Sequence, residues 1–189
     1  WQVGNFPAGW AEWNDRFRDR IREMQNVPTS RWSAGNWGDR LDGTAELFGD
    51  RTASMPVNYI VSHDDFSLHD LHACADRNNM QAWPWGPSNG GDSNNRNWDQ
   101  GGDPTAQRQA VRTGLALLAL SGGGPLMVTG GDERLRSQQC NNNAYNVDSD
   151  AMGLSWTADE QADRLRGYVA RLLAFRRDHP ELASRTPRF

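Results

Sequence analysis

The chain alternates short apolar runs with longer segments in which apolar residues recur at helical spacing. In the first passage, GWAEWND precedes a helix predicted at about 16–25, where Phe17, Ile21 and Met24 follow the i, i+4, i+7 pattern. Asp15 is the predicted N-cap, because a side-chain oxygen before the first turn can accept a hydrogen bond from a free backbone N–H.

The second passage repeats this order. PVNYIVSHD is a nearly continuous apolar run, which is typical of a strand covered on both faces. A long loop separates it from a helix predicted at about 104–121, with Asp103 and Pro104 as start signals and the glycines at 122–124 as the stop.

The third passage is GPLMVTGGDE, a polar loop and a helix predicted at about 158–178. Thr157 and Glu160 have the spacing of a capping box. An apolar stripe runs along this helix: Leu165, Tyr168, Val169, Leu172 and Leu173. A strand followed by a helix, three times over, predicts an α/β fold with a parallel sheet and right-handed crossovers.

The segment at about 66–100 is too long for an ordinary connection, and such loops are usually functional or disordered. Trp83, Trp85 and Trp98 stand in it among glycine, asparagine and aspartate. Aromatic rings on loops make flat binding faces, and sugar rings are one ligand that uses them. We interpret the segment as a binding loop, and a disordered centre at about 88–96 is the alternative.

Charge and hydropathy exclude several kinds of partner. The net charge of −4 is scattered, so nucleic acid and anionic lipid are not expected partners. The longest apolar run, LALLAL, is far short of the roughly 20 residues that a membrane-spanning helix needs. The chain opens at Trp1 without a methionine or a signal-peptide pattern, and we expect that its true beginning has been removed.

Polar residues follow the apolar strands directly. His63 and Asp64 come after YIV, and Asp132 and Glu133 come after LMVTGG. In parallel α/β folds ligands bind at this carboxyl edge, which favours a functional site. Asp64 and Asp65 cannot together flank one scissile bond, because successive strand residues point to opposite faces.

A metal site would require His63, Asp64, His69 and His72 to converge, and neither CxxC nor HExxH accompanies them. His69 and His72 lie three apart in a predicted short helix, where two surface histidines on one face are the favoured interpretation. We therefore predict no metal and no cofactor, and keep a metal-dependent phosphohydrolase as a remote alternative.

Three segments, in this order, resemble the later part of the catalytic barrel of isoamylase-type debranching enzymes, in the α-amylase superfamily of glycoside hydrolases: FPAGWAEWNDRFRDRIR, NYIVSHDDFSLHDL and GGPLMVTGGDERLRSQQCNNNAYN. The resemblance runs from Trp1 to about Leu182. It implies that residues 1–189 are the C-terminal part of a (β/α)8 catalytic domain, a TIM barrel, and comprise its last three βα units. The implied activity is cleavage of α-1,6 branch points in glycogen and amylopectin, with a branched α-glucan as the partner.

The resemblance also implies roles for single residues. Asp64 would be the third catalytic carboxylate, which holds glucosyl hydroxyls and stabilises the transition state, with His63 beside it. Trp83 and Trp85 would stack on the glucan. Further residues would line or support the same face: Asp132, Glu133, Arg134, Asn141, Asn142, Asn143 and Tyr145. For the asparagines, loop capping and turn hydrogen bonding are an equally open interpretation.

The same resemblance implies what the chain lacks. A retaining glycosidase needs a nucleophile and an acid/base about 5 Å apart, and in the family both precede the WAEWND unit. We therefore expect these residues alone to be inactive. Asp65 departs from the family pattern, and its charge would raise the pKa of Asp64 if both were buried.

Cys74 and Cys140 follow strands that would be neighbours in the barrel, so a disulfide between them is geometrically plausible. Their positions resemble secreted bacterial isoamylases, which favours a secreted or periplasmic protein; free thiols would instead indicate the cytoplasm. Two alternatives to isoamylase stay open. One is pullulanase-type or glycogen-debranching specificity, and the other is a non-catalytic glucan-binding piece.

Overall fold

The computed structural model describes residues 2–7, 9–27, 34–49 and 55–183, and its contacts divide the chain into two compact units. Unit 1 comprises Trp1–Ile60, Gly114–Met127 and Ala170–Phe189. Unit 2 comprises Val61–Thr113 and Val128–Val169. Within the described residues, no helix is long and apolar enough to cross a membrane.

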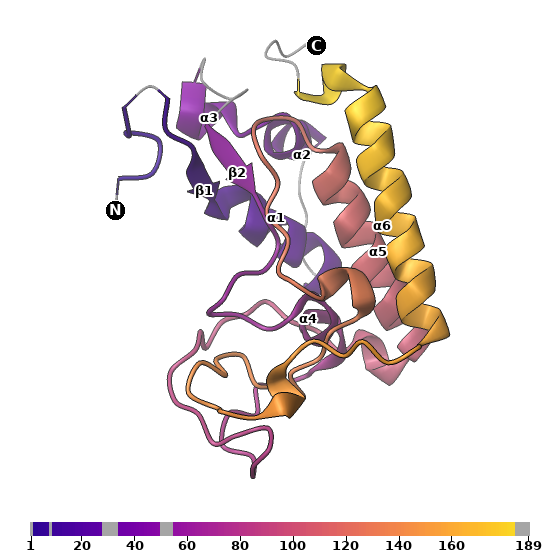
Figure 1. Cartoon of the computed structure of the whole chain (residues 1–189). Helices are drawn as coiled ribbons and strands as arrows, with labels where there is room; N and C mark the ends of the chain where they lie inside the picture. The colour runs from indigo at the N-terminus through magenta and orange to yellow at the C-terminus, as the bar shows by residue number, and fades with distance from the viewer. Residues whose placement is uncertain (1, 8, 28–33, 50–54, 184–189) are drawn as a thin grey trace. The chain divides into compact units, whose positions relative to one another are not determined.

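Unit 1 is built on two parallel strands. β1 (Glu12–Asn14) pairs with β2 (Pro56–Asn58) so that Trp13 lies opposite Val57, and Figure 1 shows the two arrows side by side. The third apolar passage adds a single parallel bridge, from Asn58 to Leu126, in place of a full strand. The predicted parallel order is therefore present, although the third member is one bridge long.

Three helices accompany the strands of unit 1: α1 (Asp15–Asn26), α2 (Ala34–Leu41) and α3 (Ala45–Phe48). α1 follows β1 directly and contacts both α2 and β2. Phe17 and Ile21 are fully buried, as the periodicity predicts. The predicted N-cap was one residue off, because Asn14 Oδ1 accepts from Phe17 N at 3.1 Å. The short helices α2 and α3 were not predicted.

A buried polar network holds the strand register of unit 1. Asn14 Nδ2 donates to Asn58 Oδ1 at 2.8 Å and to Thr44 Oγ1 at 3.0 Å. Asn58 Nδ2 in turn donates to Ser121 Oγ at 2.9 Å and to the Gly122 carbonyl at 3.0 Å. All four side chains are fully buried, and each bonded atom has a partner, as burial of polar groups requires.

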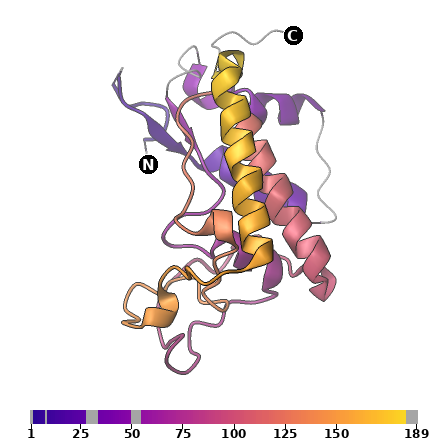
Figure 2. The same cartoon turned by 45° about the vertical axis from the view of Figure 1, so that its right-hand side comes forward.

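Two long helices each contribute one half to each unit: α5 (Pro104–Leu120) and α6 (Glu160–Asp178). In unit 1 the Arg176 guanidinium donates to the carbonyls of Ala119 and Ser121, and the last turns of α6 lie beside the end of α5 in Figure 2. A short 3-10 helix, η5 (Pro180–Ala183), follows α6.

The start of α6, in unit 2, differs from the prediction. Asp159 Oδ1 accepts from Ala162 N at 2.8 Å, so Asp159 caps the helix in place of the predicted pair of Thr157 and Glu160. The predicted stripe is buried at Leu165, whereas Leu173, in the unit 1 half of the helix, is exposed.

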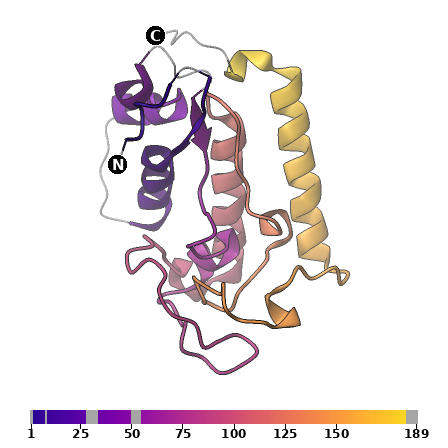
Figure 3. The ribbon, with the colours of Figure 1, turned by 60° about the vertical axis from the view of Figure 1, so that its left-hand side comes forward.

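Unit 2 consists mostly of loops around short helices. α4 (Leu68–Ala73) is the short helix predicted at His69 and His72, at the start of the long segment at about 66–100, and its N-cap is Ser67. Three short 3-10 turns complete the unit: η2 (Gln100–Gly102), η3 (Asp132–Arg134) and η4 (Asp150–Met152). In Figure 3 the loop that follows α4 extends from the lower end of the ribbon.

Candidate functional site

His63 and Asp64 lie together on the surface of unit 2, just after the buried residue Val61 and the intervening Ser62. His63 Nε2 lies 3.1 Å from Asp64 Oδ2, and the two side chains are 71% and 68% exposed. Asp65 is buried and accepts hydrogen bonds from the backbone N–H of Ser62 at 3.1 Å and from its hydroxyl at 2.8 Å. The expected effect of the Asp65 charge on Asp64 required both carboxylates to be buried. Asp64 is exposed, so this requirement is not met.

Asp132 supports this part of the unit from inside. It is 1% exposed, and its Oδ1 accepts from Leu68 N at 2.9 Å at the start of α4. Burial raises the pKa of Asp132 to about 7, and the hydrogen bond from Leu68 and the positive charge of Arg136 offset part of that rise. Asp132 is therefore a buried anchor with no surface for direct contact with a ligand.

Glu133 and Arg134 also make internal contacts. Glu133 Oε2 accepts from Gly131 N at 3.0 Å. Arg134 Nη1 pairs with Asp163 Oδ1 at 3.0 Å, and Nη2 donates to the Thr157 carbonyl at 3.2 Å. These bonds orient the guanidinium, which lies 6.0 Å from the ring centroid of Trp156.

The asparagine run holds the long loop of unit 2. Asn141 and Asn142 are fully buried. Asn141 Nδ2 donates to the Trp85 carbonyl at 2.8 Å, and its Oδ1 accepts from Ser88 Oγ at 3.0 Å. Asn142 Nδ2 donates to Asn95 Oδ1 at 3.0 Å. Of the two interpretations left open for these residues, loop hydrogen bonding is the one their contacts fit.

The next residues of the run reach the tip of the same loop. Asn143 Nδ2 donates to the Asn89 carbonyl at 2.7 Å, and the Tyr145 hydroxyl donates to Asn89 Oδ1 at 2.7 Å. Tyr145 is 72% exposed and Trp83 is 71% exposed, so both rings are open to a ligand. The segment 88–96, for which disorder was the alternative, is thus hydrogen-bonded to the asparagine run.

A disulfide joins Cys74 to Cys140, with an S–S distance of 2.06 Å and Cα atoms 5.8 Å apart. The predicted pairing is confirmed. Asp70, a residue that sequence reasoning did not select, reinforces the connection, because its buried Oδ2 accepts from Gln138 N at 2.6 Å and from Cys140 N at 3.3 Å. Its position in the segment HDDFSLHDLH was the available signal.

The histidines of that segment do not form a metal site. His72 is fully buried in α4, so its prediction as a surface residue was wrong: the short helix turns it inward with Leu68 and Leu71. His69 is half-buried, and its Nδ1 lies 3.4 Å from Asp70 Oδ1. In the described ranges, no three histidine, cysteine, aspartate or glutamate side chains are grouped to hold a metal ion.

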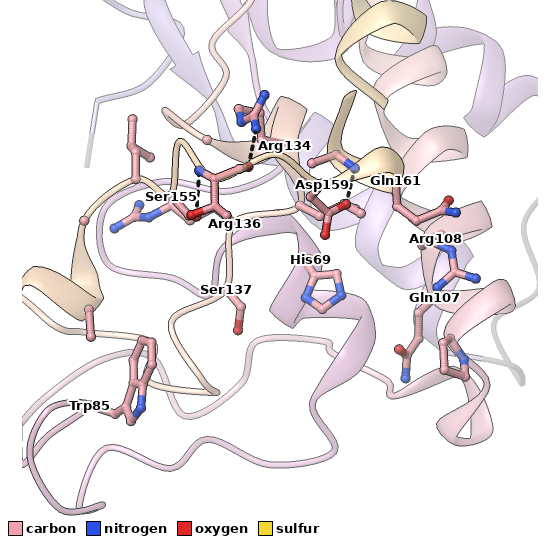
Figure 4. A pocket seen from close by; sticks show the side chains of 18 residues that line it. His69, Trp85, Gln107, Arg108, Arg134, Arg136, Ser137, Ser155, Asp159 and Gln161 are labelled. Carbon is pink, nitrogen blue, oxygen red and sulfur yellow. Dashed lines mark hydrogen bonds between the residues drawn. The ribbon is translucent and has the colours of Figure 1, made fainter. Parts of the chain in front are cut away.

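A pocket of about 470 Å³ opens within unit 2 beside His69 (Figure 4). We call it the basic pocket, and its principal side chains are His69, Trp85, Gln107, Arg108, Arg134 and Arg136. In Figure 4 Trp85 lies on one side and Gln107 and Arg108 lie on the other, with His69 and Ser137 between them. Trp85 and Arg134 were predicted from the sequence as substrate-binding residues, and His69 was considered there only as a metal ligand; Gln107, Arg108 and Arg136 were not considered.

Known proteins resemble the chain along nearly its whole length, although no family model matches it. The isoamylase of Flavobacterium sp is 49% identical over 185 residues, which cover 96% of this chain and 24% of that protein. The isoamylase of Pseudomonas amyloderamosa is 45% identical over 192 residues, with the same coverage. The chain is homologous to part of the isoamylase-type debranching enzymes. It spans about a quarter of the length of the curated relatives it matches.

More distant relatives agree with this assignment. The glycogen operon protein GlgX homolog of Mycobacterium tuberculosis is 34% identical over 191 residues, which cover 95% of this chain and 26% of that protein. Among solved structures, the pullulanase from Bacillus acidopullulyticus matches with a TM-score of 0.64 at 20% identity, over 91% of this chain and 19% of that one. The α/β fold of the chain is therefore that of a segment of pullulanase.

Proposed function

We propose that this isoamylase homologue acts in the hydrolysis of α-1,6 branch points of glycogen and amylopectin, as part of a (β/α)8 catalytic domain. The observation that carries the proposal is the identity of 49% with an isoamylase over 96% of the chain. The parallel pairing of β1, β2 and the bridge at Leu126 supports consecutive strands of such a barrel.

In this proposal Asp64 is the carboxylate that holds the glucosyl unit and stabilises the positive charge of the oxocarbenium-like transition state. Its exposure and its contact with His63 support the role, because both side chains are exposed to solvent, where a sugar at the carboxyl end of a strand could reach them. Trp83 and Tyr145, both exposed, offer rings for stacking on the glucan, and the buried asparagines 141 and 142 hold the loop that carries Trp83 and Trp85.

We further propose that these residues do not cleave glucan by themselves. A retaining mechanism needs two carboxylates about 5 Å apart, one as nucleophile and one as acid/base. The resemblance assigns neither role to a residue of this chain, so both would come from elsewhere in a longer protein. A non-catalytic glucan-binding role for the isolated residues is the alternative.

The cysteines support a secreted or periplasmic protein, because structural disulfides persist in oxidising compartments. Alkylation of the denatured protein, purified from its source without reductant, tests this proposal. A mass unchanged by the alkylating agent is the expected result. Two alkylated cysteines would instead indicate the cytoplasm.

The test of function uses the longer protein that would supply the nucleophile and the acid/base, and it compares the Asp64→Asn variant of that protein with the unchanged form in release of reducing ends from glycogen, amylopectin and pullulan. We expect at least about a hundredfold loss of turnover for Asp64→Asn, because a group that stabilises transition-state charge is removed. Asp76→Asn changes another exposed carboxylate of unit 2 and should retain full activity. Equal activity of the two variants would remove Asp64 from the mechanism. Preference for pullulan would indicate pullulanase-type specificity.

A further inference from the structure

We propose that the basic pocket binds a sugar phosphate, with the phosphate group against Arg108 and the sugar ring toward Trp85. This site is separate from Asp64, which does not line the pocket, and the proposal does not depend on the cleavage reaction. A volume of about 470 Å³ is in the range of small-molecule sites and holds a phosphorylated monosaccharide.

The charges of the lining favour an anion. Three arginines line the pocket, against one carboxylate, that of Asp159. Asp163 neutralises Arg134 through the ion pair at 3.0 Å, and Asp159 is engaged as the N-cap of α6. Arg108 and Arg136 make no ion pair within 4 Å among the described residues. Arg136 interacts electrostatically with the buried Asp132, so Arg108 is the cation that a phosphate group would neutralise.

The donors available at Arg108 point to a phosphate group in particular. The Arg108 side chain makes one hydrogen bond, from Nη2 to Thr105 Oγ1 at 3.3 Å, which leaves most of its planar set of donors unused. A guanidinium group matches phosphate oxygens two at a time. Gln161, on the same side of the pocket in Figure 4, presents an amide beside it.

Two helix starts add to the positive potential. The first turns of α5, through Pro104, Gln107 and Arg108, and of α6, through Gln161 and Ala162, both belong to the lining. The aligned peptide dipoles give the start of an α-helix partial positive charge, which favours a nearby anion, although Asp103 and Asp159 already accept hydrogen bonds from the first N–H groups here.

The opposite side of the pocket suits the sugar. Trp85 offers an aromatic ring, and Ser137 and His69 lie between it and Arg108 (Figure 4). An aromatic face with hydroxyl and imidazole groups nearby is chemistry suited to a monosaccharide. A neutral glucan would use this side but would leave the charge of Arg108 uncompensated, which is why we favour a phosphorylated ligand.

The test is isothermal titration calorimetry of the purified protein at low salt with glucose 1-phosphate, inorganic phosphate and maltotriose. We expect saturable binding of glucose 1-phosphate that Arg108→Gln weakens about tenfold or more, because a charged hydrogen-bonding group is lost. Arg112→Gln is the matched control: it lies one turn further along α5, over the Tyr168 ring, and does not line the pocket. It should leave the affinity unchanged.

The other probes identify the source of the phosphate. If glucose 1-phosphate binds more tightly than inorganic phosphate and Trp85→Ala abolishes this difference, the site recognises a sugar phosphate. Equal affinities would confine recognition to the phosphate group and overturn the sugar part of the proposal. Two results would overturn the phosphate site. The first is that maltotriose displaces glucose 1-phosphate and that its affinity does not change in Arg108→Gln. The second is that no probe saturates the protein at millimolar concentrations.

Three further measurements keep the result interpretable. If Arg108→Gln fails to fold, Arg108→Lys, which keeps the charge, takes its place. Separately, binding of glucose 1-phosphate by the unchanged protein should weaken as added salt screens the charges of the pocket. Salt-independent binding would contradict the proposal. Asp64→Asn should leave the affinity for glucose 1-phosphate unaltered, so that failure of this proposal and failure of the proposed hydrolysis are distinguishable.

Discussion

Asn79 and Asn142 exchange two hydrogen bonds across the long loop of unit 2. Asn79 Nδ2 donates to Asn142 Oδ1 at 2.9 Å, and Asn142 N donates to Asn79 Oδ1 at 3.0 Å. Both residues are buried, and Asn142 Nδ2 also bonds to Asn95 and to the Asp92 carbonyl. One amide side chain therefore joins three separate points of the loop.

Asn142→Ala should loosen this loop. The substitution removes three hydrogen bonds of the Asn142 side chain, with Asn79 Nδ2, Asn95 Oδ1 and the Asp92 carbonyl, and each is worth about 0.5–1.5 kcal/mol. We expect a lower free energy of unfolding and faster proteolytic cleavage within 77–95, measured by mass spectrometry of limited digests. Asn146→Ala, at an exposed position of the same run, is the control. Equal cleavage rates for the two variants would refute the role of Asn142.

Asp132 should make stability depend on pH. Its pKa is raised to about 7 in the folded state, chiefly by burial, from an ordinary value of 3.8. The folded state therefore binds the proton more tightly than the unfolded state. The resulting stabilisation is complete below pH 4, is lost as the pH rises toward 7, and amounts to about 4 kcal/mol over that range.

Asp132→Asn removes this titration while keeping an oxygen for the N–H of Leu68. The variant should gain stability relative to the unchanged protein as the pH rises from about 4 to 7, and the difference should level off above that. Urea unfolding at several pH values measures it. Glu133→Gln, at the neighbouring position, should show no such trend, and a constant difference for Asp132→Asn would contradict the assignment.

Loss of the disulfide should destabilise unit 2. Cys74 and Cys140 are 66 residues apart, and closing a loop of that length is worth about 4 kcal/mol in the chain-entropy model. We expect the double substitution Cys74→Ala, Cys140→Ala to lower the midpoint of thermal unfolding. Reductant should lower the midpoint of the unchanged protein and have no effect on the double variant; the same response in both would show that reductant acts elsewhere.

Asn58→Leu should break the network of unit 1. It removes the acceptor of Asn14 and the donor to Ser121 and to the Gly122 carbonyl, all in a buried setting. Several unpaired groups together should cost about 2–4 kcal/mol in the free energy of unfolding measured with denaturant. Val57→Thr, at the partly exposed neighbour, should cost less. A cost for Asn58→Leu no larger than that of Val57→Thr would mean that the network does not hold the strands.

Local signals were sufficient for the long helices. The spacing of Phe17 and Ile21 and the start signal at Asp103 predicted α1 and α5, because a helix buries one periodic stripe and begins with a side-chain acceptor. Sequence patterns did not locate the caps of α1 and α6 correctly. Several oxygen-bearing residues precede each helix, and the backbone path decides which of them reaches the free N–H groups.

By itself, the sequence determined the order of the principal strands and helices and the resemblance to isoamylases, because the first follows from periodicity and the second from local motifs. The pairing of Cys74 with Cys140 was plausible from the expected neighbouring strands, and the tertiary structure decided it. Only the tertiary structure decided that Asp64 is exposed while Asp132 is buried, that the asparagines hold a loop, and that Arg108 and Trp85 line one pocket. Burial and partners depend on residues distant along the chain, and no local pattern encodes which of them will meet.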